Sequence, residues 1–239
     1  MKLRTILTHV TGLLLAIALG LLGHDLPRAG EVPTAAVGPL PAHYRTHAWN
    51  LDWAARSSIG SAPGPGAQQG YAQAQSIRNG QAEYSLDGRE WKELTIGLRL
   101  SSGAMVRTDT NAFVDLFLKH NGPVVRVTPD TLLILKKLYF ETSDQETVIQ
   151  TLLYLPQGRI LGAVKKLSAF STYEVLTPED TVGIRGTQYD VSANGRIEVF
   201  EGAVLRQGPH GLELIRPRRA LSAVERKALF DDPIVADRP

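Results

Sequence analysis

Dipeptides that favour tight turns recur between short runs of β-forming residues from about Ala82 onward. Asp87-Gly88, Asn121-Gly122 and Asn194-Gly195 each follow such a run. Asn-Gly and Asp-Gly readily adopt the positive φ angles of hairpin turns. The runs recur at intervals of about ten residues with no long helical pattern between them, which indicates an all-β unit. The sequence therefore predicts an all-β fold of stacked short strands and hairpins, with a sandwich, a barrel and a solenoid left open.

Alternation within two of these runs predicts which side chains face the core. Between residues 113 and 118, Val114, Leu116 and Leu118 share an apolar face, whereas Phe113, Asp115 and Phe117 form a mixed one. Further along, Tyr189 and Val191 are in phase with Ile197 and Val199 across the Asn194-Gly195 turn. We therefore expect the intervening Asp190, Arg196 and Glu198 to face water.

The amino terminus has the layout of an export signal. Lys2 and Arg4 precede an apolar run from Val10 to Gly23. A short positive region followed by such a run is typical of a secretory signal peptide, and we assign residues 1–24 to one. The alternative is an uncleaved anchor in the inner membrane. Both interpretations place the rest of the chain outside the cytoplasm, in the periplasm or at the cell surface, with membrane contact only through a retained anchor.

Composition divides the remainder into three parts. Residues 25–79 are rich in Ala, Pro and Gly, which predicts a flexible linker, interrupted by a short helix bearing Trp49 and Trp53. Residues 80–208 hold the β-rich runs. Residues 209–239 form a tail in which Ser222 and Glu225 have the spacing of a capping box, so we expect a short basic helix there.

Patterns typical of catalysis and cofactor binding are missing from the sequence. It has no cysteine, no phosphate-binding or dinucleotide loop, and no nucleophile elbow or zinc-protease motif. His43 and His47 have metal-ligand spacing but no third ligand nearby, and His120 and His210 are separate loop histidines without a nameable partner. The net charge of +2 is too small to indicate a nucleic-acid-binding surface. We expect no enzyme, no metal, no cofactor and no nucleic-acid partner.

Several segments between residues 82 and 206 resemble the FecR domain family. The resemblance lies in "GAMVRTDTNAFVDLFL", in "LPQGRILGAV", in "YEVLTPEDTVGIRGTQYDV" with its Arg-Gly-Thr, and in "GRIEVFEGAVLRQG" with a Glu-Gly turn in a closing hairpin. It implies a non-enzymatic β structure with solenoid-like stacking. Founding members of the family sense an occupied outer-membrane receptor and signal to a cytoplasmic sigma factor. Anti-sigma and receptor-contact regions are not evident in this sequence, so we expect a stand-alone exported FecR-like protein.

The stretch "GIRG" places an arginine between two glycines within a β pattern. A similar G-x-x-G loop holds nucleic acid in KH domains, but between helices rather than strands. We predict a structural role: Arg185 bonds carbonyls or a carboxylate where the strands turn, because buried guanidinium donors need partners. An exposed, ligand-gripping Arg185 is the alternative. The whole predicted motif is Thr177, Pro178, Gly183, Arg185, Gly186 and Thr187.

These observations favour a binding module over an enzyme. The expected function is recognition of a protein or a cell-envelope component, with signalling as one context. A structural component of an envelope assembly is the second hypothesis, and an uncharacterised hydrolase is the third. The sequence does not identify a ligand-binding residue.

Overall fold

A computed structural model describes residues 62–122, 124–222, 224–225 and 229. The predicted signal peptide, most of the predicted linker, and the residues His43, His47, Trp49 and Trp53 lie outside this part of the chain. All described residues belong to a single unit of the chain, Ala36–Pro239.

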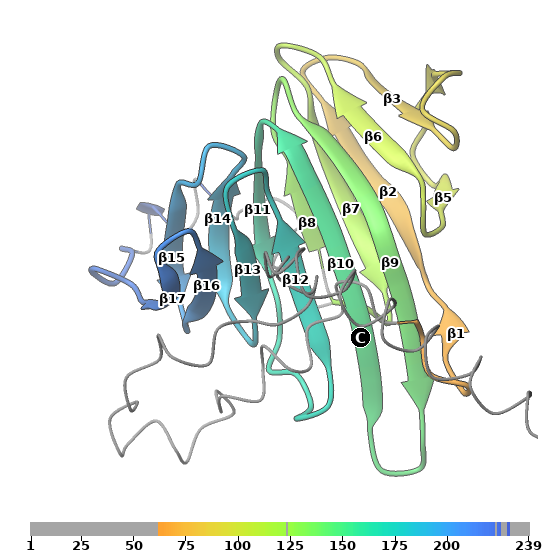
Figure 1. Ribbon diagram of the computed structural model, residues 1–239. Helices are drawn as coiled ribbons and strands as arrows, with labels where there is room; N and C mark the ends of the chain where they lie inside the picture. Colours follow the sequence, from red (N-terminus) through yellow and green to blue (C-terminus); the bar gives the residue numbers. More distant parts are fainter. Residues whose placement is uncertain (1–61, 123, 223, 226–228, 230–239) are drawn as a thin grey trace, which may run out of the picture. The chain divides into compact units, whose positions relative to one another are not determined.

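The described residues form two β-sheets (Figure 1). The ten-stranded sheet, here sheet A, has the order β17-β16-β13-β12-β10-β9-β6-β3-β4, with β1 beside β9. Its strands are β1 (Gln68–Gln69), β3 (Ala82–Ser85), β4 (Lys92–Glu93), β6 (Met105–Thr108), β9 (Leu132–Thr142), β10 (Thr147–Gln157), β12 (Thr172–Leu176), β13 (Thr181–Ile184), β16 (Val204–Gly208) and β17 (Gly211–Ile215).

The seven-stranded sheet, here sheet B, has the order β15-β14-β11-β8-β7-β2-β5. Its strands are β2 (Tyr71–Arg78), β5 (Arg99–Leu100), β7 (Phe113–Lys119), β8 (Val124–Val127), β11 (Arg159–Ala163), β14 (Gln188–Ser192) and β15 (Ile197–Glu201). Neighbours pair antiparallel except β10 and β12, which are parallel. The chain passes repeatedly from one sheet to the other, so each sheet contains strands from the whole described length of the chain. The predicted all-β, stacked-strand fold is confirmed.

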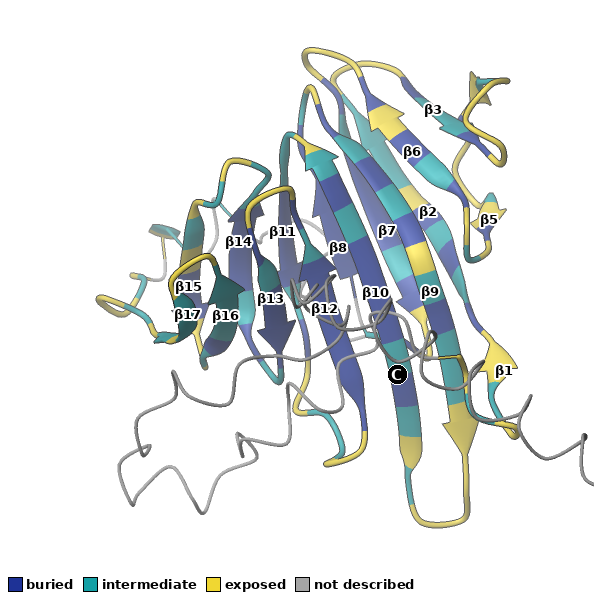
Figure 2. Ribbon diagram, viewed as in Figure 1, coloured by how far each residue is buried: buried dark blue, intermediate teal, exposed yellow. Residues whose placement is uncertain are grey.

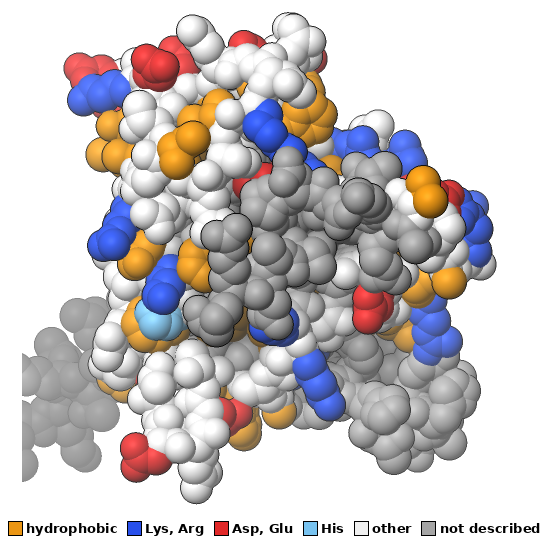
Figure 3. Space-filling model, turned by 180° about the vertical axis from the view of Figure 1, so that it is seen from behind, with side chains coloured by type: hydrophobic (Ala, Val, Ile, Leu, Met, Phe, Trp, Pro, Cys, Tyr) orange, Lys and Arg blue, Asp and Glu red, His pale blue; other side chains and the backbone are white. Residues whose placement is uncertain are grey.

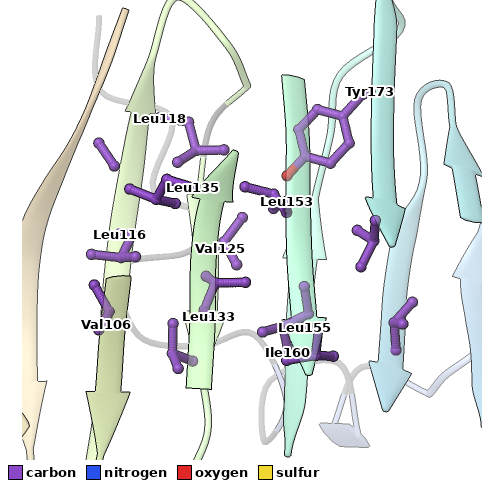
Figure 4. Close-up of a cluster of buried hydrophobic side chains, with 14 of the residues drawn as sticks. Val106, Leu116, Leu118, Val125, Leu133, Leu135, Leu153, Leu155, Ile160 and Tyr173 are labelled. Atoms are coloured by element: carbon purple, nitrogen blue, oxygen red, sulfur yellow. The ribbon is translucent and has the colours of Figure 1, made fainter. Parts of the chain in front are cut away.

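The hydrophobic core lies between the two sheets. Leu116 and Val125 from sheet B and Leu133 and Leu153 from sheet A are almost completely buried, and Figure 4 shows them with their neighbours between the strands. Burial is greatest along the middle strands and falls off at the turns (Figure 2). Val114, Leu116 and Leu118 all belong to this core, as their alternation predicts.

Residues with positive φ angles form the predicted hairpin turns. Gly195 has a φ of 79° in the turn between the antiparallel strands β14 and β15, where Tyr189 faces Val199 and Val191 faces Ile197. Between β7 and β8, the positive φ angles belong to His120 (65°) and Gly122 (126°). The Asp87-Gly88 turn likewise joins the antiparallel pair β3 and β4.

The Glu201-Gly202 turn corrects one expectation. It does not close a hairpin, because β15 pairs with β14 whereas β16 pairs with β13 and β17. The turn instead moves the chain from sheet B to sheet A. A sequence pattern of strand, Glu-Gly and strand is the same for a hairpin and for a change of sheet, which depends on partners far away in the chain.

The β domain extends beyond the predicted limits of 80 and 208. β1 and β2 lie inside the predicted linker, and β2 pairs along its length with β7. Its Ala72 and Ala74 are buried in the core, so small residues that suggest a linker here provide close packing. At the other end, β17 lies in the predicted tail and pairs with β16.

The predicted C-terminal helix is not supported, since the described residues hold no helical element and much of that segment lies outside them. The capping-box bonds do form: the amide of Ser222 donates to Glu225 Oε2 at 3.0 Å, and the amide of Glu225 donates to Ser222 Oγ at 3.2 Å. Within the described ranges, no helix is long and apolar enough to cross a membrane.

Candidate functional site

The first half of the predicted motif is a compact turn between β12 and β13. Thr177 is buried, and its Oγ1 accepts hydrogen bonds from the amides of Asp180 at 2.9 Å and Glu179 at 3.2 Å. The amide of Thr177 donates to the carbonyl of Asp180 at 2.8 Å. Pro178 is exposed at the tip, where its missing N–H costs nothing. The turn thus ends one strand and starts the next with its own backbone amides bonded.

The second half of the motif forms the exit from β13. Arg185 is half-buried just after the strand, and its Nη2 donates to the backbone carbonyl of Ser168 at 2.5 Å. Thr187 is buried and forms a reciprocal backbone pair with Val164, with both N–H···O distances 2.9 Å. Its hydroxyl also donates to the carbonyl of Ala203 at 2.8 Å. The exit is therefore bonded to two other parts of the β domain.

Glycine is required at this exit. Gly186 has a φ of 82°, and a Cβ there would lie 3.0 Å from the Cα of Lys166. A Cβ at Gly202 would lie 2.4 Å from the carbonyl oxygen of Gly186. Three backbone segments therefore meet at the Arg-Gly-Thr sequence: the β11–β12 connection, the β13–β14 connection and the β15–β16 turn. Gly183 lies within β13, buried and opposite Glu174 of β12.

The motif thus supports the loop of residues 164–171, here the crossover loop, which carries the chain from sheet B to sheet A. Ser171 secures the far end of this loop, because its Oγ accepts a hydrogen bond from the amide of Ile149 at 3.0 Å. Between these attachments the loop presents Phe170, whose exposed fraction is 64%, together with the exposed Lys165 and Lys166. A large exposed apolar side chain on a fixed loop is a feature of recognition surfaces.

A charged cluster that sequence reasoning misses lies on the outer face of sheet B. Asp115 is fully buried and receives two hydrogen bonds from Arg126, from Nε to Oδ1 at 2.7 Å and from Nη2 to Oδ2 at 3.1 Å. Ser76 donates to the same carboxylate at 2.8 Å, and Arg78 lies 3.4 Å away. This bidentate geometry is the strong form of an arginine–carboxylate pair. The mixed face expected for β7 holds a buried ion pair.

A second buried carboxylate corrects the expectation that Asp190 faces water. Asp190 is 1% exposed and accepts hydrogen bonds from Arg159, with Nε to Oδ1 at 2.8 Å and Nη2 to Oδ2 at 2.5 Å. These bonds raise the pKa of Arg159. Arg159 belongs to the neighbouring strand of the β11–β14 ladder, which alternation within one strand does not reveal. Arg196 and Glu198 are exposed as predicted, and they pair with each other at 3.0 Å.

The carboxylate of Asp180 connects the Thr177 turn to β16. Arg206 Nε donates to Asp180 Oδ1 at 2.8 Å, and this bond raises the pKa of Arg206. Gly208 leaves room for the carboxylate, since a Cβ there would lie 2.4 Å from Asp180 Oδ1. Sequence reasoning singles out Thr177 and Pro178 but not Asp180, although the Thr-x-x-Asp spacing of the turn is a visible signal.

Two tyrosines share a hydrogen bond in the core. The hydroxyl groups of Tyr173 on β12 and Tyr189 on β14 lie 3.1 Å apart, so the pair bridges the two sheets. Burial raises the pKa of both phenols well above the usual value. Gly162 on β11 makes space for Tyr189, because a Cβ there would lie 2.3 Å from its Cζ. A neutral, buried pair of this kind stabilises packing.

The two histidines of the described residues lie in different turns. His120 is exposed and stacks on Phe140 with ring centroids 4.1 Å apart, while His210 lies in the β16–β17 turn. Asp87 and Asp109 have lowered pKa values because backbone amides donate hydrogen bonds to their carboxylates. Within the described ranges, no group of three or more His, Asp or Glu side chains is placed to hold a metal ion. On the face shown in Figure 3, hydrophobic side chains occur in small groups among lysines and arginines.

Comparison with known proteins identifies this framework. Residues 104–205 match the family model of the FecR protein. Over this region the chain is similar to the FecR domain. The match begins just before β6 and ends within β16, so the matched region includes the Thr177–Thr187 motif, the crossover loop and the Asp115–Arg126 pair. The FecR family consists of regulators and signal transducers rather than enzymes. No curated protein and no solved structure matches the chain.

Proposed function

We propose that this chain is a non-enzymatic, extracytoplasmic FecR-like module that recognises a protein or a component of the cell envelope. The match to the FecR family over residues 104–205 carries the proposal, because that family is signalling-related. The local chemistry agrees with it. The buried carboxylates Asp115, Asp180 and Asp190 are each bonded to an arginine within the fold, so these groups support the framework.

The crossover loop is the recognition element in this proposal. Phe170 offers an apolar anchor, and Lys165 and Lys166 place positive charge on the same loop. Aromatic anchors are common at the centres of protein interfaces, and charged residues are common at their rims. The complementary partner has an apolar pocket with acidic residues at its rim. The structural motif around Arg185 sets the position of this loop without contacting the partner itself.

The test is a pull-down from a membrane extract with the full chain as bait. Phe170→Ser removes the proposed anchor, and Ile96→Ser is the matched control because Ile96 is 66% exposed on a different loop. We expect one dominant envelope protein to be retained by wild type and by Ile96→Ser, and to be lost with Phe170→Ser. Equal retention by all three baits would place recognition elsewhere. Self-association alone would favour a structural component of an envelope assembly.

A further inference from the structure

One end of sheet B holds more positive charge than its own carboxylates neutralise. At this end the sheet has the order β8-β7-β2-β5 (Figure 1), and these strands contain Arg78, Arg99, Lys119 and Arg126 but only one carboxylate. That carboxylate, Asp115, is bonded to Arg126 and Arg78. Arg99 and Lys119 are exposed, and neither forms an ion pair with another residue of the described part of the chain. The described part of the fold therefore leaves two cations at this end without a counter-charge.

The two cations flank one aromatic side chain. Tyr71 lies directly opposite Lys119 in the β2–β7 ladder, and the Arg99 guanidinium lies over the Tyr71 ring, with its Cζ 4.7 Å from the ring centroid. All three residues alternate along their strands with residues of the inter-sheet core, so they point to the outer face of sheet B. The two cations come from the strands on opposite sides of β2. We call Tyr71, Arg99 and Lys119 the cationic face.

Arg99 is restrained before any ligand binds. β5 pairs with β2, and the chain just before β5 adds two bonds: the amide of Gly97 donates to the carbonyl of Ala74 at 2.7 Å, and Gln73 Nε2 donates to the carbonyl of Gly97 at 3.0 Å. The cation–π contact with Tyr71 restrains the guanidinium itself. A restrained side chain loses less conformational entropy on binding, so the cationic face is preorganised for an anion.

We propose that the cationic face binds an extended acidic segment of a partner protein, in which Arg99 and Lys119 each pair with a carboxylate. An arginine fork matches the two oxygens of a carboxylate. Every second side chain of an extended segment points the same way, with a spacing of about 7 Å. Two acidic residues separated by one other residue therefore meet the cations that flank Tyr71. Tyrosine and arginine are also the residue types enriched where protein interfaces bind most strongly.

A polypeptide fits this face better than a lipid bilayer does. Tyr71 and the neighbouring Phe117 are half-buried, so neither ring stands free to insert between lipids. Charge alone is then left to hold a bilayer, and two cations are fewer than the clusters of about four to eight that bind anionic lipid.

This inference goes beyond the proposed function and does not rest on it. The crossover loop connects β11 to β12 and shares no residue with the cationic face. We therefore expect Phe170→Ser to leave binding at the cationic face unchanged, so failure of one proposal is distinguishable from failure of the other.

The experiment measures binding of the full chain to a fluorescein-labelled peptide in which glutamate and threonine alternate, by fluorescence anisotropy at low salt. Arg99→Gln and Lys119→Gln each remove one cation, and Lys92→Gln is the matched control because Lys92 is exposed on β4 of sheet A. We expect the Kd to rise about threefold for each of the first two and about tenfold for both together, as for exposed ion pairs. Lys92→Gln should equal wild type. Similar weakening by Lys92→Gln, or no binding by wild type, would overturn the proposal.

Substitution of Tyr71 tests the arrangement rather than the charge. Tyr71→Phe keeps an aromatic ring under Arg99, whereas Tyr71→Leu removes it, and circular dichroism checks that both variants are folded. We expect Tyr71→Phe to bind the acidic peptide like wild type and Tyr71→Leu to bind it about two- to threefold more weakly. Equal binding by both variants would contradict the proposal.

A lipid surface is the competing ligand, and vesicles of phosphatidylglycerol test it. Cosedimentation of the full chain with these vesicles is compared between wild type and the double variant Arg99→Gln, Lys119→Gln. We expect both chains to cosediment equally. Cosedimentation that is lost in the double variant would assign the cationic face to anionic lipid and overturn the proposal.

Discussion

Arg126 and Arg185 show two ways in which this fold uses an arginine. Arg126 lies in the middle of a strand, holds a fully buried carboxylate with two bonds and is itself only 6% exposed. Arg185 lies just past the end of a strand, is half-buried and donates to a backbone carbonyl of a connecting loop. The first balances a buried charge, whereas the second positions a loop. We therefore expect substitutions at the Arg126 site to reduce the free energy of unfolding more than substitutions at the Arg185 site.

The largest effect is expected from Asp115→Asn. The substitution leaves Arg126 buried without its counter-charge, and breaking a buried ion pair costs about 3–5 kcal/mol of the free energy of unfolding. Urea denaturation followed by circular dichroism measures the loss. Glu83→Gln is the matched control, because Glu83 pairs with Arg107 at the surface, where such a pair contributes about 0.2–1 kcal/mol. Similar losses in both variants would show that the Asp115 pair is not protected from solvent.

A smaller loss is expected from Gly202→Ala. The residue has a φ of 81°, and a Cβ there would approach the carbonyl oxygen of Gly186 to 2.4 Å. Backbone strain and overpacking each cost about 1–3 kcal/mol. Gly97→Ala isolates the first contribution, because Gly97 has a φ of 90° but a Cβ there would meet no atom within 4 Å. If the two alanine variants unfold at the same urea concentration, crowding between residue 202 and the carbonyl oxygen of Gly186 adds nothing to the cost, which contradicts the prediction.

The tyrosine pair predicts a pH dependence at the alkaline end. Tyr173 and Tyr189 have raised pKa values in the fold because burial disfavours the phenolate, whereas the unfolded phenols ionise near their ordinary value of 10. The folded state therefore binds more protons above that pH, so stability is full below about pH 10 and falls as pH rises further. We expect the double variant Tyr173→Phe, Tyr189→Phe to show a flatter decline in unfolding free energy above about pH 10. Absorbance of the phenolate should show the two wild-type phenols ionising only on unfolding, and early ionisation of all tyrosines would contradict their burial.

Sequence patterns predict contacts between residues that are close together in the chain and miss contacts between residues that are far apart in it. The Asn194-Gly195 hairpin is predictable because its turn and both strands lie within a few residues. The Asp190–Arg159 pair and the Leu229–Arg126 contact join residues far apart in the chain, so strand alternation alone places Asp190 in water. Ala72 and Ala74 look like linker because a small residue is informative only when its packing partners are known.

Arg185 is visible in the sequence for a local reason, since two glycines around a charged residue mark a constrained backbone. The sequence predicts that Arg185 bonds a backbone carbonyl, but it does not predict which one. The carbonyl belongs to Ser168, in another part of the β domain. Arg185 and the rest of the Thr177–Thr187 motif remain a structural prediction that one substitution tests.

That substitution is Arg185→Lys, and its unfolding free energy in urea is the measurement that bears most directly on the account. Lysine keeps the charge but lacks the planar fork that reaches the carbonyl of Ser168, and a lost hydrogen bond from a charged group costs about 1.5–3 kcal/mol. Partial exposure of Arg185 places the expected loss at the lower end of this range, about 1.5–2 kcal/mol. A loss of this size with an unchanged circular dichroism spectrum is the predicted result. Unchanged stability together with loss of the partner retained in the membrane pull-down would show that Arg185 grips a ligand, and would contradict the account.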